Sequence, residues 1–349
     1  MPIPSAESQL QFLKDVQALL EDGQFAATYK FALLIALADI AVESGVDDDR
    51  PLPVPLTAIA VKFVEYYWQQ SVPFAGAAAS EILRQNAGQQ AAVIRLLAAQ
   101  RLAGFDSLPK LRSDARAWAE TQNSVAQIVR VMPLYRLQVV AGTLRPFLYP
   151  HEIEGGAITL NPGVAHHLRR FHPLVTGLAR NRWIATIRRI PANLYAVGQA
   201  QDLEVFLFGS AREPTRRYLE PLLDLQHGRC LYCRESLRPA AAHVDHFVPW
   251  VLHRCDAVSN LVAAHDHCNL AKKDLLAAEQ HAEHWVMRND EASRAVWSSL
   301  LQPIDPAWAT VGRVARWAYD RAFDLGALTW VRGREMQQLS ERYRGLLPP

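Results

Sequence analysis

Cysteines and histidines are crowded into one short part of the chain. All four cysteines and eight of the twelve histidines lie between residues 227 and 284 of the 349-residue sequence. Side chains of these two types bind transition metals, and histidine also carries out acid–base chemistry near neutral pH. Chance and core packing explain such crowding poorly, so we expect the chemistry of this protein to reside in this stretch.

Two pairs of soft ligands within it have the spacing of a zinc site. Cys230 and Cys233 form a Cys-x-x-Cys pair, which alone is compatible with a redox motif, half of a zinc site or two unrelated buried thiols. His265 and Cys268 repeat the same spacing downstream. Two turns that each present two ligands close a tetrahedral site, and Zn²⁺ accepts a Cys₃His set. We therefore predict a structural zinc ion on these four residues.

Two neighbouring side chains are not expected to bind this zinc ion. His267 competes with His265, but a spacing of one residue from Cys268 would strain the turn. Cys255 has no partner at a suitable spacing, so we expect an ordinary buried or surface thiol.

The residues between the two pairs offer harder ligands. Asp245 and Asn269 supply a carboxylate and an amide oxygen, which suit Mg²⁺ or Mn²⁺. Because neighbours on a strand point to opposite faces, one of Asp245 and His246 can bind a cation while the other contacts a water molecule. Metal-assisted hydrolysis of a phosphodiester needs this pairing of cation and base. His243 is a further candidate ligand or outer partner of the ion, and the alternative for Asp245-His246 is an exposed polar pair.

From about residue 224 to residue 276 the sequence resembles an HNH endonuclease domain of the ββα-metal fold. The shared motifs are Cys-x-x-Cys, then Asp-His-x-x-Pro at Asp245 to Pro249, Asn260-Leu261, Cys268-Asn269 and the following Lys272. These motifs are specific, although they cover only about 50 of the 349 residues. The sequence departs from the family at His265, where its zinc-bearing members commonly have cysteine. Since histidine also binds zinc, the departure makes the site a variant and does not remove it.

The resemblance implies a role for each matching residue. Asp245 and Asn269 would hold the catalytic divalent cation, and His246 would be the general base on the attacking water. Asn260 would hold the loop and orient His246. The implied activity is metal-dependent hydrolysis of DNA, by nicking or by a dimer that cuts both strands. Two alternatives to a DNA endonuclease are not excluded. One is a catalytically silent, zinc-organised binding or assembly module, and the other is an RNA-directed nuclease.

Basic residues supply candidate contacts to nucleic acid. Near the motifs these are Lys272, Lys273 and Arg254, with a solvated surface as the alternative. From Gly155 to Gln201 the chain has no acidic residue and several arginines, which favours a surface facing phosphate. The alternative is that these arginines cap carbonyls or pair with the acidic first 50 residues. The candidates from this run are Arg169, Arg170 and Arg182.

Periodicity predicts the elements that carry these residues. Apolar residues at helical spacing predict helices at residues 10–20, at 59–67 after a proline-rich break, and at 77–102. The aromatic run 66–68 is more typical of a core than of a base-stacking surface. The residues at 147–160 predict a hairpin. Asn161-Pro162 predicts the start of a helix, and the apolar residues at 205–208 predict a buried strand. A second helix start is expected at Asp305-Pro306, with an apolar face from Trp308 to Ala322.

We therefore expect a mainly α protein with a small α+β element. The predicted parts are a helical N-terminal domain, a mixed basic middle segment, an HNH domain closed by zinc, and a helical C-terminal region. Their expected bounds are 1–140, 141–223, 224–278 and 279–349. The helical parts around the HNH domain are similar in architecture to accessory regions of bacterial restriction or phage-defence nucleases.

Composition excludes several other classes. The formal net charge of +2 is close to neutral and does not indicate a class of partner. Four cysteines are too few for a disulfide-stabilised scaffold. The apolar run Phe31 to Ala38 is far shorter than the roughly 20 residues of a membrane span, and no cationic segment precedes it. We expect a cytoplasmic protein with DNA as its partner, acting as a homodimer or with a regulatory protein. No Gly-rich loop with Gly-Lys-Ser/Thr is present, so no ATP dependence is expected from this chain.

Overall fold

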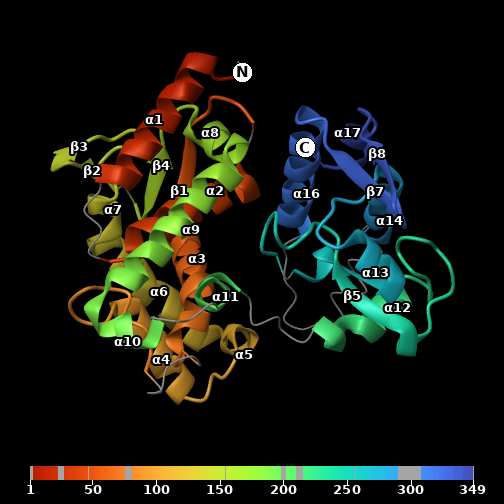
Figure 1. Cartoon of the computed structure of the whole chain (residues 1–349), viewed down its shortest axis with the longest axis horizontal. Coiled ribbons are helices and arrows are strands. Elements are labelled where there is room, and N and C mark those ends of the chain that lie inside the picture. The colour runs from red at the N-terminus through yellow and green to blue at the C-terminus, as the bar shows by residue number, and fades with distance from the viewer. Residues whose placement is uncertain are drawn as a thin grey trace. The chain divides into compact units, whose positions relative to one another are not determined.

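The computed structural model describes residues 3–22, 27–45, 47–74, 81–153, 155–197, 202–209, 215–255, 257–289 and 308–348. The chain divides into two compact units, unit 1 from Met1 to Ala211 and unit 2 from Arg212 to Pro349. The described residues are mainly helical with four small two-stranded sheets, which confirms the predicted class (Figure 1). The compact units do not follow the expected bounds at residues 140 and 278, because the middle segment packs with the N-terminal helices and the C-terminal region packs with the HNH segment.

Unit 1 is built around one helix that is apolar on nearly every side. In α2 (Tyr29–Ser44) almost every residue from Lys30 to Val42 is buried. A helix of this kind has to be covered all round. The helices that pack against it are α3 (Leu56–Trp68), α7 (Pro133–Arg136), α8 (Val164–Arg170) and α9 (His172–Arg189), and α1 (Ala6–Asp22) packs against α8 and α9. No helix among the described residues is long and apolar enough to cross a membrane.

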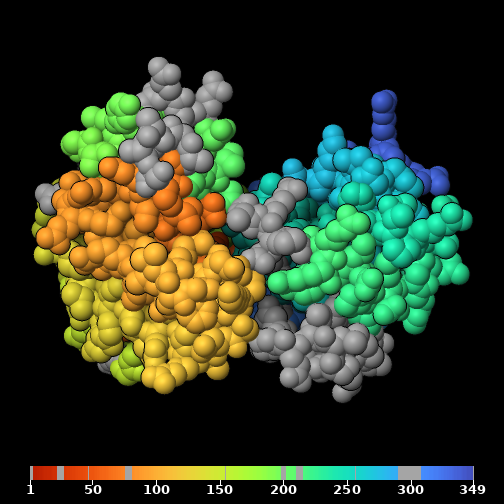
Figure 2. All heavy atoms as spheres, turned by 90° about the horizontal axis from the view of Figure 1, so that it is seen from below, coloured from red at the N-terminus to blue at the C-terminus, as the bar shows by residue number. Residues whose placement is uncertain are grey.

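The remaining helices of unit 1 complete its core. In α3, Phe63 and Tyr67 are fully buried, so the aromatic run belongs to the core. In the space-filling view, residues of α4 to α6 lie together on one face of unit 1 (orange to yellow, Figure 2). The bounds are α4 (Ala92–Leu102), α5 (Leu108–Ser113), α6 (Ala115–Val131), α7 (Pro133–Arg136), α10 (Leu194–Val197) and α11 (Leu203–Phe208).

The proline-rich break and the expected hairpin turn out to be partners. Strand β1 (Leu52–Pro55) pairs antiparallel with β4 (Ala157–Leu160), with Leu52 opposite Leu160. The predicted hairpin at residues 147–160 is therefore wrong. Prolines are tolerated in β1 because a strand in a two-stranded sheet has one edge without a partner. The local hairpin of this region is instead β2 (Val139–Val140) with β3 (Thr143–Leu144).

Three further expectations for unit 1 need correction. The predicted helix at residues 77–102 begins only at Ala92; of its first part, residues 77–80 lie outside the described residues and 81–91 are not helical. The helix expected from Asn161-Pro162 begins at Val164, after a turn in which Gly163 has φ 76°. An added Cβ there would lie 2.8 Å from a carboxylate oxygen of Asp49, so glycine is required. Residues 205–208 form part of helix α11, not a strand.

Unit 2 contains the ββα arrangement that the resemblance implied. Strand β5 (Ala242–His246) pairs antiparallel with β6 (Leu261–His265), and α13 (Asp266–Lys272) follows β6 without a break. Helix α12 (Leu219–Leu225) packs against both strands. Short 3₁₀ turns lie at Gln69–Ser71 and Pro191–Asn193 in unit 1, and at Thr215–Tyr218, Pro239–Ala241 and Val258–Asn260 in unit 2.

The C-terminal region packs onto this ββα core. Its elements are α14 (Glu279–Arg288), α16 (Trp308–Asp324), β7 (Leu328–Arg332), β8 (Glu335–Gln338) and α17 (Tyr343–Leu346). The β7–β8 hairpin corrects the expectation of a purely helical tail, and β7 hydrogen-bonds to the backbone just after α13. The apolar face predicted for α16 is buried as expected, from Val311 to Ala322. The helix start expected at Asp305-Pro306 lies outside the described residues.

Candidate metal centre and nuclease site

The four predicted zinc ligands lie together in unit 2. Their ligand atoms, three sulfurs and one imidazole nitrogen, are all within 4.8 Å of one another. Cys230 and Cys233 come from the turn after α12, His265 ends β6, and Cys268 lies in the first turn of α13. This set of four soft ligands fits a tetrahedral Zn²⁺ ion, so the structure brings together the cluster that the spacing predicted.

Hydrogen bonds orient the imidazole of His265 for metal binding. Its Nδ1 lies 3.3 Å from Sγ of Cys233, and its Nε2 lies 3.1 Å from the carbonyl oxygen of Ser236. When Nε2–H donates to that carbonyl, Nδ1 presents a lone pair to the thiols, which is the form that binds a metal. His267 stacks on His265 at 4.9 Å between ring centroids and does not belong to the cluster. Cys255 also lies outside it, as expected.

Electrostatics of the cluster favour a bound cation. Burial and the neighbouring thiols of Cys230 and Cys233 raise the pKa of Cys268 well above its usual range. Burial also raises the pKa of Cys233. Several thiolates this close together repel one another unless a cation lies between them. The donor set and its crowding therefore both fit a zinc ion.

Asp245 lies next to the last residue of β5, and three groups of the protein contact its carboxylate. Oδ1 accepts a hydrogen bond from the backbone N–H of His246 at 2.8 Å. Oδ2 accepts one from the hydroxyl of Tyr232 at 2.5 Å and forms an ion pair with Nζ of Lys272 at 3.0 Å. The carboxylate is thus held in one orientation by residues from three separate elements. Sequence reasoning did not single out Tyr232, whose position between two zinc ligands was the only available signal.

Lys272 is not the surface cation that its position after the motif predicted. Its side chain has 0 % exposure, and besides the ion pair it donates a hydrogen bond to the carbonyl oxygen of His246 at 2.9 Å. A phosphate in solvent cannot reach an ammonium group at this depth. We therefore correct the prediction that Lys272 contacts nucleic acid, whereas the adjacent Lys273 is exposed.

Asn260 holds the loop that follows β5. Its side-chain oxygen accepts a hydrogen bond from Val248 N–H at 2.8 Å, and its amide nitrogen donates to the carbonyls of Val248 and Cys255, each at 3.1 Å. Its own carbonyl accepts from Phe247 N–H at 2.7 Å, directly after His246. The half-buried imidazole of His246 lies 5.2 Å from the Trp250 ring, measured between centroids.

The remaining predicted site residues of unit 2 lie on or near α13. Asn269 is half-buried in its first turn, next to the zinc ligand Cys268. His243 is exposed, with Nε2 3.5 Å from Oδ1 of Asp266, so its described contact is with that carboxylate. Arg254 is half-buried in the loop after β5.

In unit 1 the predicted basic residues separate into buried and exposed groups. Arg169 is buried, and its guanidinium donates to the carbonyls of Ala41 at 3.2 Å and Val42 at 2.9 Å at the end of α2. It therefore caps a helix, which corrects its prediction as a nucleic-acid contact. Arg170 and Arg182 are exposed and stay candidates.

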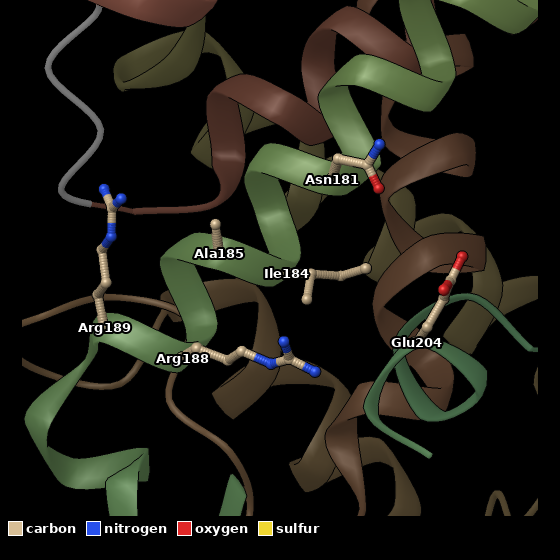
Figure 3. Close-up of a pocket in the computed structure, with 6 residues that line it drawn as sticks. All are labelled: Asn181, Ile184, Ala185, Arg188, Arg189 and Glu204. Carbon is tan, nitrogen blue, oxygen red and sulfur yellow. The ribbon is translucent and has the colours of Figure 1, made fainter. Parts of the chain in front are cut away.

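The exposed part of α9 borders a hollow of about 540 Å³. The guanidinium groups of Arg188 and Arg189 extend in different directions from the end of the helix (Figure 3). Both belong to the acid-free, arginine-rich run that the sequence indicated as a surface for nucleic acid, although the candidates named from it were Arg169, Arg170 and Arg182. The hollow is lined by Asn181, Ile184, Ala185, Arg188 and Arg189 of α9 and by Glu204 of α11.

Comparison with known families gives a match to one segment in each unit. Residues 230–275 match the family model described as HNH endonuclease, which confirms the predicted resemblance and covers both zinc turns, β5, β6 and α13. At the level of the family, this match indicates a nuclease-type hydrolase that binds metal and acts on nucleic acid. Residues 9–145, within unit 1, match a second model described as Domain of unknown function (DUF8808). No curated protein and no solved structure matches the chain.

Proposed function

We propose that this chain is a metal-dependent HNH endonuclease that hydrolyses phosphodiester bonds of DNA. The observation that carries the proposal is the coincidence of the HNH match with an intact set of side chains on the ββα core. Asp245 and His246 end β5, Asn260 fixes the following loop, and Asn269 begins α13. A silent module would be expected to have lost the base or a metal ligand. A role in bacterial defence rests on the predicted architecture alone.

In this proposal each side chain has a distinct task. His246 accepts the proton of the attacking water, which is the task of the general base in metal-assisted hydrolysis. Asp245 and Asn269 hold the catalytic cation, since a carboxylate and an amide oxygen are ligands that suit Mg²⁺ or Mn²⁺. That cation supplies neutralisation of charge on the phosphate and on the departing oxygen. Asn260 keeps the backbone after His246 in place through Phe247.

Basic residues outside the ββα core would bind the backbone of the substrate. Lys273 and Arg254 flank the site in unit 2, and Arg170 and Arg182 are exposed in unit 1. Arg188 and Arg189 at the α9 hollow extend this group. Such contacts provide affinity for phosphates without reading the sequence of the bases.

A plasmid assay tests the proposal. Purified zinc-loaded protein is incubated with supercoiled DNA and Mg²⁺ or Mn²⁺, with and without EDTA, in parallel with a structured RNA. We expect metal-dependent nicked or linear DNA with the wild type, and loss of cleavage in His246→Ala with the fold and DNA binding intact. His227→Ala is the matched control, because it removes an exposed imidazole of unit 2 that lies outside the ββα core.

Three outcomes would contradict the proposal. Full-rate cleavage by His246→Ala would exclude the assigned base. Cleavage of RNA but not DNA would move the activity to the RNA-directed class. Absence of cleavage of either substrate by folded, zinc-loaded wild type would favour the silent binding module.

A further inference from the structure

The zinc turn contacts the carboxylate that is proposed to hold the catalytic cation. Tyr232 lies between Cys230 and Cys233, and its hydroxyl donates to Oδ2 of Asp245 at 2.5 Å. The ring is 3 % exposed and packs edge-on against His281 and Trp330, each at 5.3 Å between centroids. Close packing of this kind restricts the movement of the ring.

The second zinc turn is linked to the same oxygen atom from the other side. Lys272 lies one helical turn after Cys268 in α13, and its Nζ is 3.0 Å from Oδ2 of Asp245. The same ammonium donates to the carbonyl of His246. Each half of the zinc cluster therefore has a neighbouring side chain on Oδ2 of Asp245. Helix α13 also carries Asn269, the other proposed ligand of the catalytic cation.

We propose that Tyr232 and Lys272 are positioning residues that couple the zinc cluster to the catalytic cation site. With Oδ2 engaged by two donors and Oδ1 by the backbone N–H of His246, only one lone pair of Oδ1 would be left to take an ion, so the carboxylate would act as a single-oxygen ligand. This inference rests on the proposed function, because it assumes that Asp245 binds the cation. It adds that the cation affinity is set by residues of the zinc turns.

The arrangement also has a consequence for metal choice. Ca²⁺ is commonly held by carboxylates through both oxygens in a flexible shell of six to eight ligands, whereas Mg²⁺ requires near-octahedral geometry with single oxygens. A carboxylate whose second oxygen is already bound by a hydroxyl and an ammonium disfavours the Ca²⁺ arrangement. Tyr232 and Lys272 would thus favour Mg²⁺ and Mn²⁺ over Ca²⁺.

A contribution to stability alone does not explain why the ammonium group of Lys272 is buried in an ion pair. A fully buried ion pair carries a desolvation cost that its attraction often fails to offset, and apolar replacements of buried pairs are frequently neutral. In Lys272→Met the side chain stays unbranched but is one atom shorter and has no ammonium, so it can no longer bind either group of β5. Because loss of one partner of a buried ion pair is itself destabilising, the variant is compared with the wild type at equal zinc content and with the fold verified. An effect of this change on metal binding would therefore report positioning of Asp245.

The test measures Mn²⁺ binding by electron paramagnetic resonance on the full-length, zinc-loaded chain, so that it does not depend on cleavage. Outer hydrogen bonds to metal ligands typically contribute about 10–100-fold to affinity, and we expect a loss of that size in Tyr232→Phe with zinc content unchanged. Ca²⁺ should compete with Mn²⁺ more strongly in Tyr232→Phe than in wild type. Tyr343→Phe is the matched control, because it removes a tyrosine hydrogen bond to another carboxylate of unit 2, Asp320, at 2.7 Å.

Each outcome decides the inference. Equal Mn²⁺ affinity in wild type and Tyr232→Phe would overturn it, and so would an equal loss in Tyr343→Phe. If Tyr232→Phe loses zinc, Lys272→Met becomes the deciding variant, and wild-type Mn²⁺ affinity in that variant would overturn the coupling. Failure of the wild type to bind Mn²⁺ would instead remove the proposed function itself, which distinguishes the two failures.

Discussion

Asn260 is the residue whose side chain fixes the loop between the two strands of the nuclease site. Its carboxamide makes three hydrogen bonds, all to backbone groups of the loop between β5 and β6, and it is fully buried. Buried polar groups at such a position need hydrogen-bond partners. The sequence predicted that this residue holds the loop, and the hydrogen bonds agree with that role. Its influence on His246 passes through the backbone of Phe247.

Replacing Asn260 with alanine should therefore affect both stability and cleavage. Each buried group left without a partner costs about 1–3 kcal/mol, so we expect a clearly lower free energy of unfolding for unit 2 and no plasmid cleavage. Asn289→Ala is the control, because Asn289 is also buried in unit 2 but its side chain donates a single hydrogen bond, to Ser259. Urea unfolding and the plasmid assay measure the two effects. An unchanged unfolding midpoint in Asn260→Ala would show that the loop does not need this side chain.

At the scale of secondary-structure elements, the sequence predicted those whose pattern is local. Helices α1, α3 and α16 have apolar residues at helical spacing, and the ββα order followed from motifs that are close together in the chain. The pairing of β1 with β4 was missed because its two strands are distant in sequence and neither carries a signal that names the other. The β7–β8 hairpin was also missed, although its sequence carries a local signal: β-favouring residues at Thr329 to Val331 precede a turn at Gly333.

Short segments and long polar side chains account for the other errors. A run of four apolar residues does not distinguish a strand from a buried helix, and at residues 203–208 the burial follows helical spacing. Lys272 was predicted to contact phosphate from its place after the motif, and Arg169 because its run of arginines contains no acidic residue. Both are buried because each finds partners supplied by another element, the end of β5 for Lys272 and the end of α2 for Arg169. Such partners are visible only once the chain is folded.

The zinc cluster joins the elements of unit 2, and its removal should loosen them. Cys230→Ser removes one ligand of the turn that also holds Tyr232, so we expect loss of zinc and a lower thermal midpoint of unit 2. Zinc binding contributes directly to folding in small metal-stabilised domains. Cys255→Ser is the matched control, because Cys255 is the one cysteine outside the cluster. Zinc content and thermal unfolding of both variants are compared, and a zinc-loaded Cys230→Ser with a wild-type midpoint would refute the assignment.

At the scale of the whole chain, chemistry and basic surface lie in different units. The HNH match lies within unit 2, whereas the longest stretch without acidic residues lies in unit 1 and includes α9. Arg182, Arg188 and Arg189 are exposed on α9 and form no ion pair with any described residue. Unpaired arginines on one helix attract phosphates at long range. The net charge of only +2 does not indicate this basic surface, because an excess of acidic residues in the first part of the chain offsets its positive charge.

Replacing Arg182, Arg188 and Arg189 together with alanine should weaken substrate binding without removing the catalytic step. We expect a higher KM for DNA, with a rate at saturating DNA close to that of the wild type, because the residues proposed for catalysis are in the other unit. Removing one arginine–phosphate interaction lowers the slope of log affinity against log salt by about 0.9, so the salt dependence of DNA binding should also become shallower. Arg116→Ala is the control, since Arg116 is exposed on unit 1 but paired with Glu120 at 2.8 Å. A triple variant with wild-type KM and wild-type salt dependence would show that the α9 surface does not bind the substrate, and the affinity would then have to come from Arg170 or from unit 2.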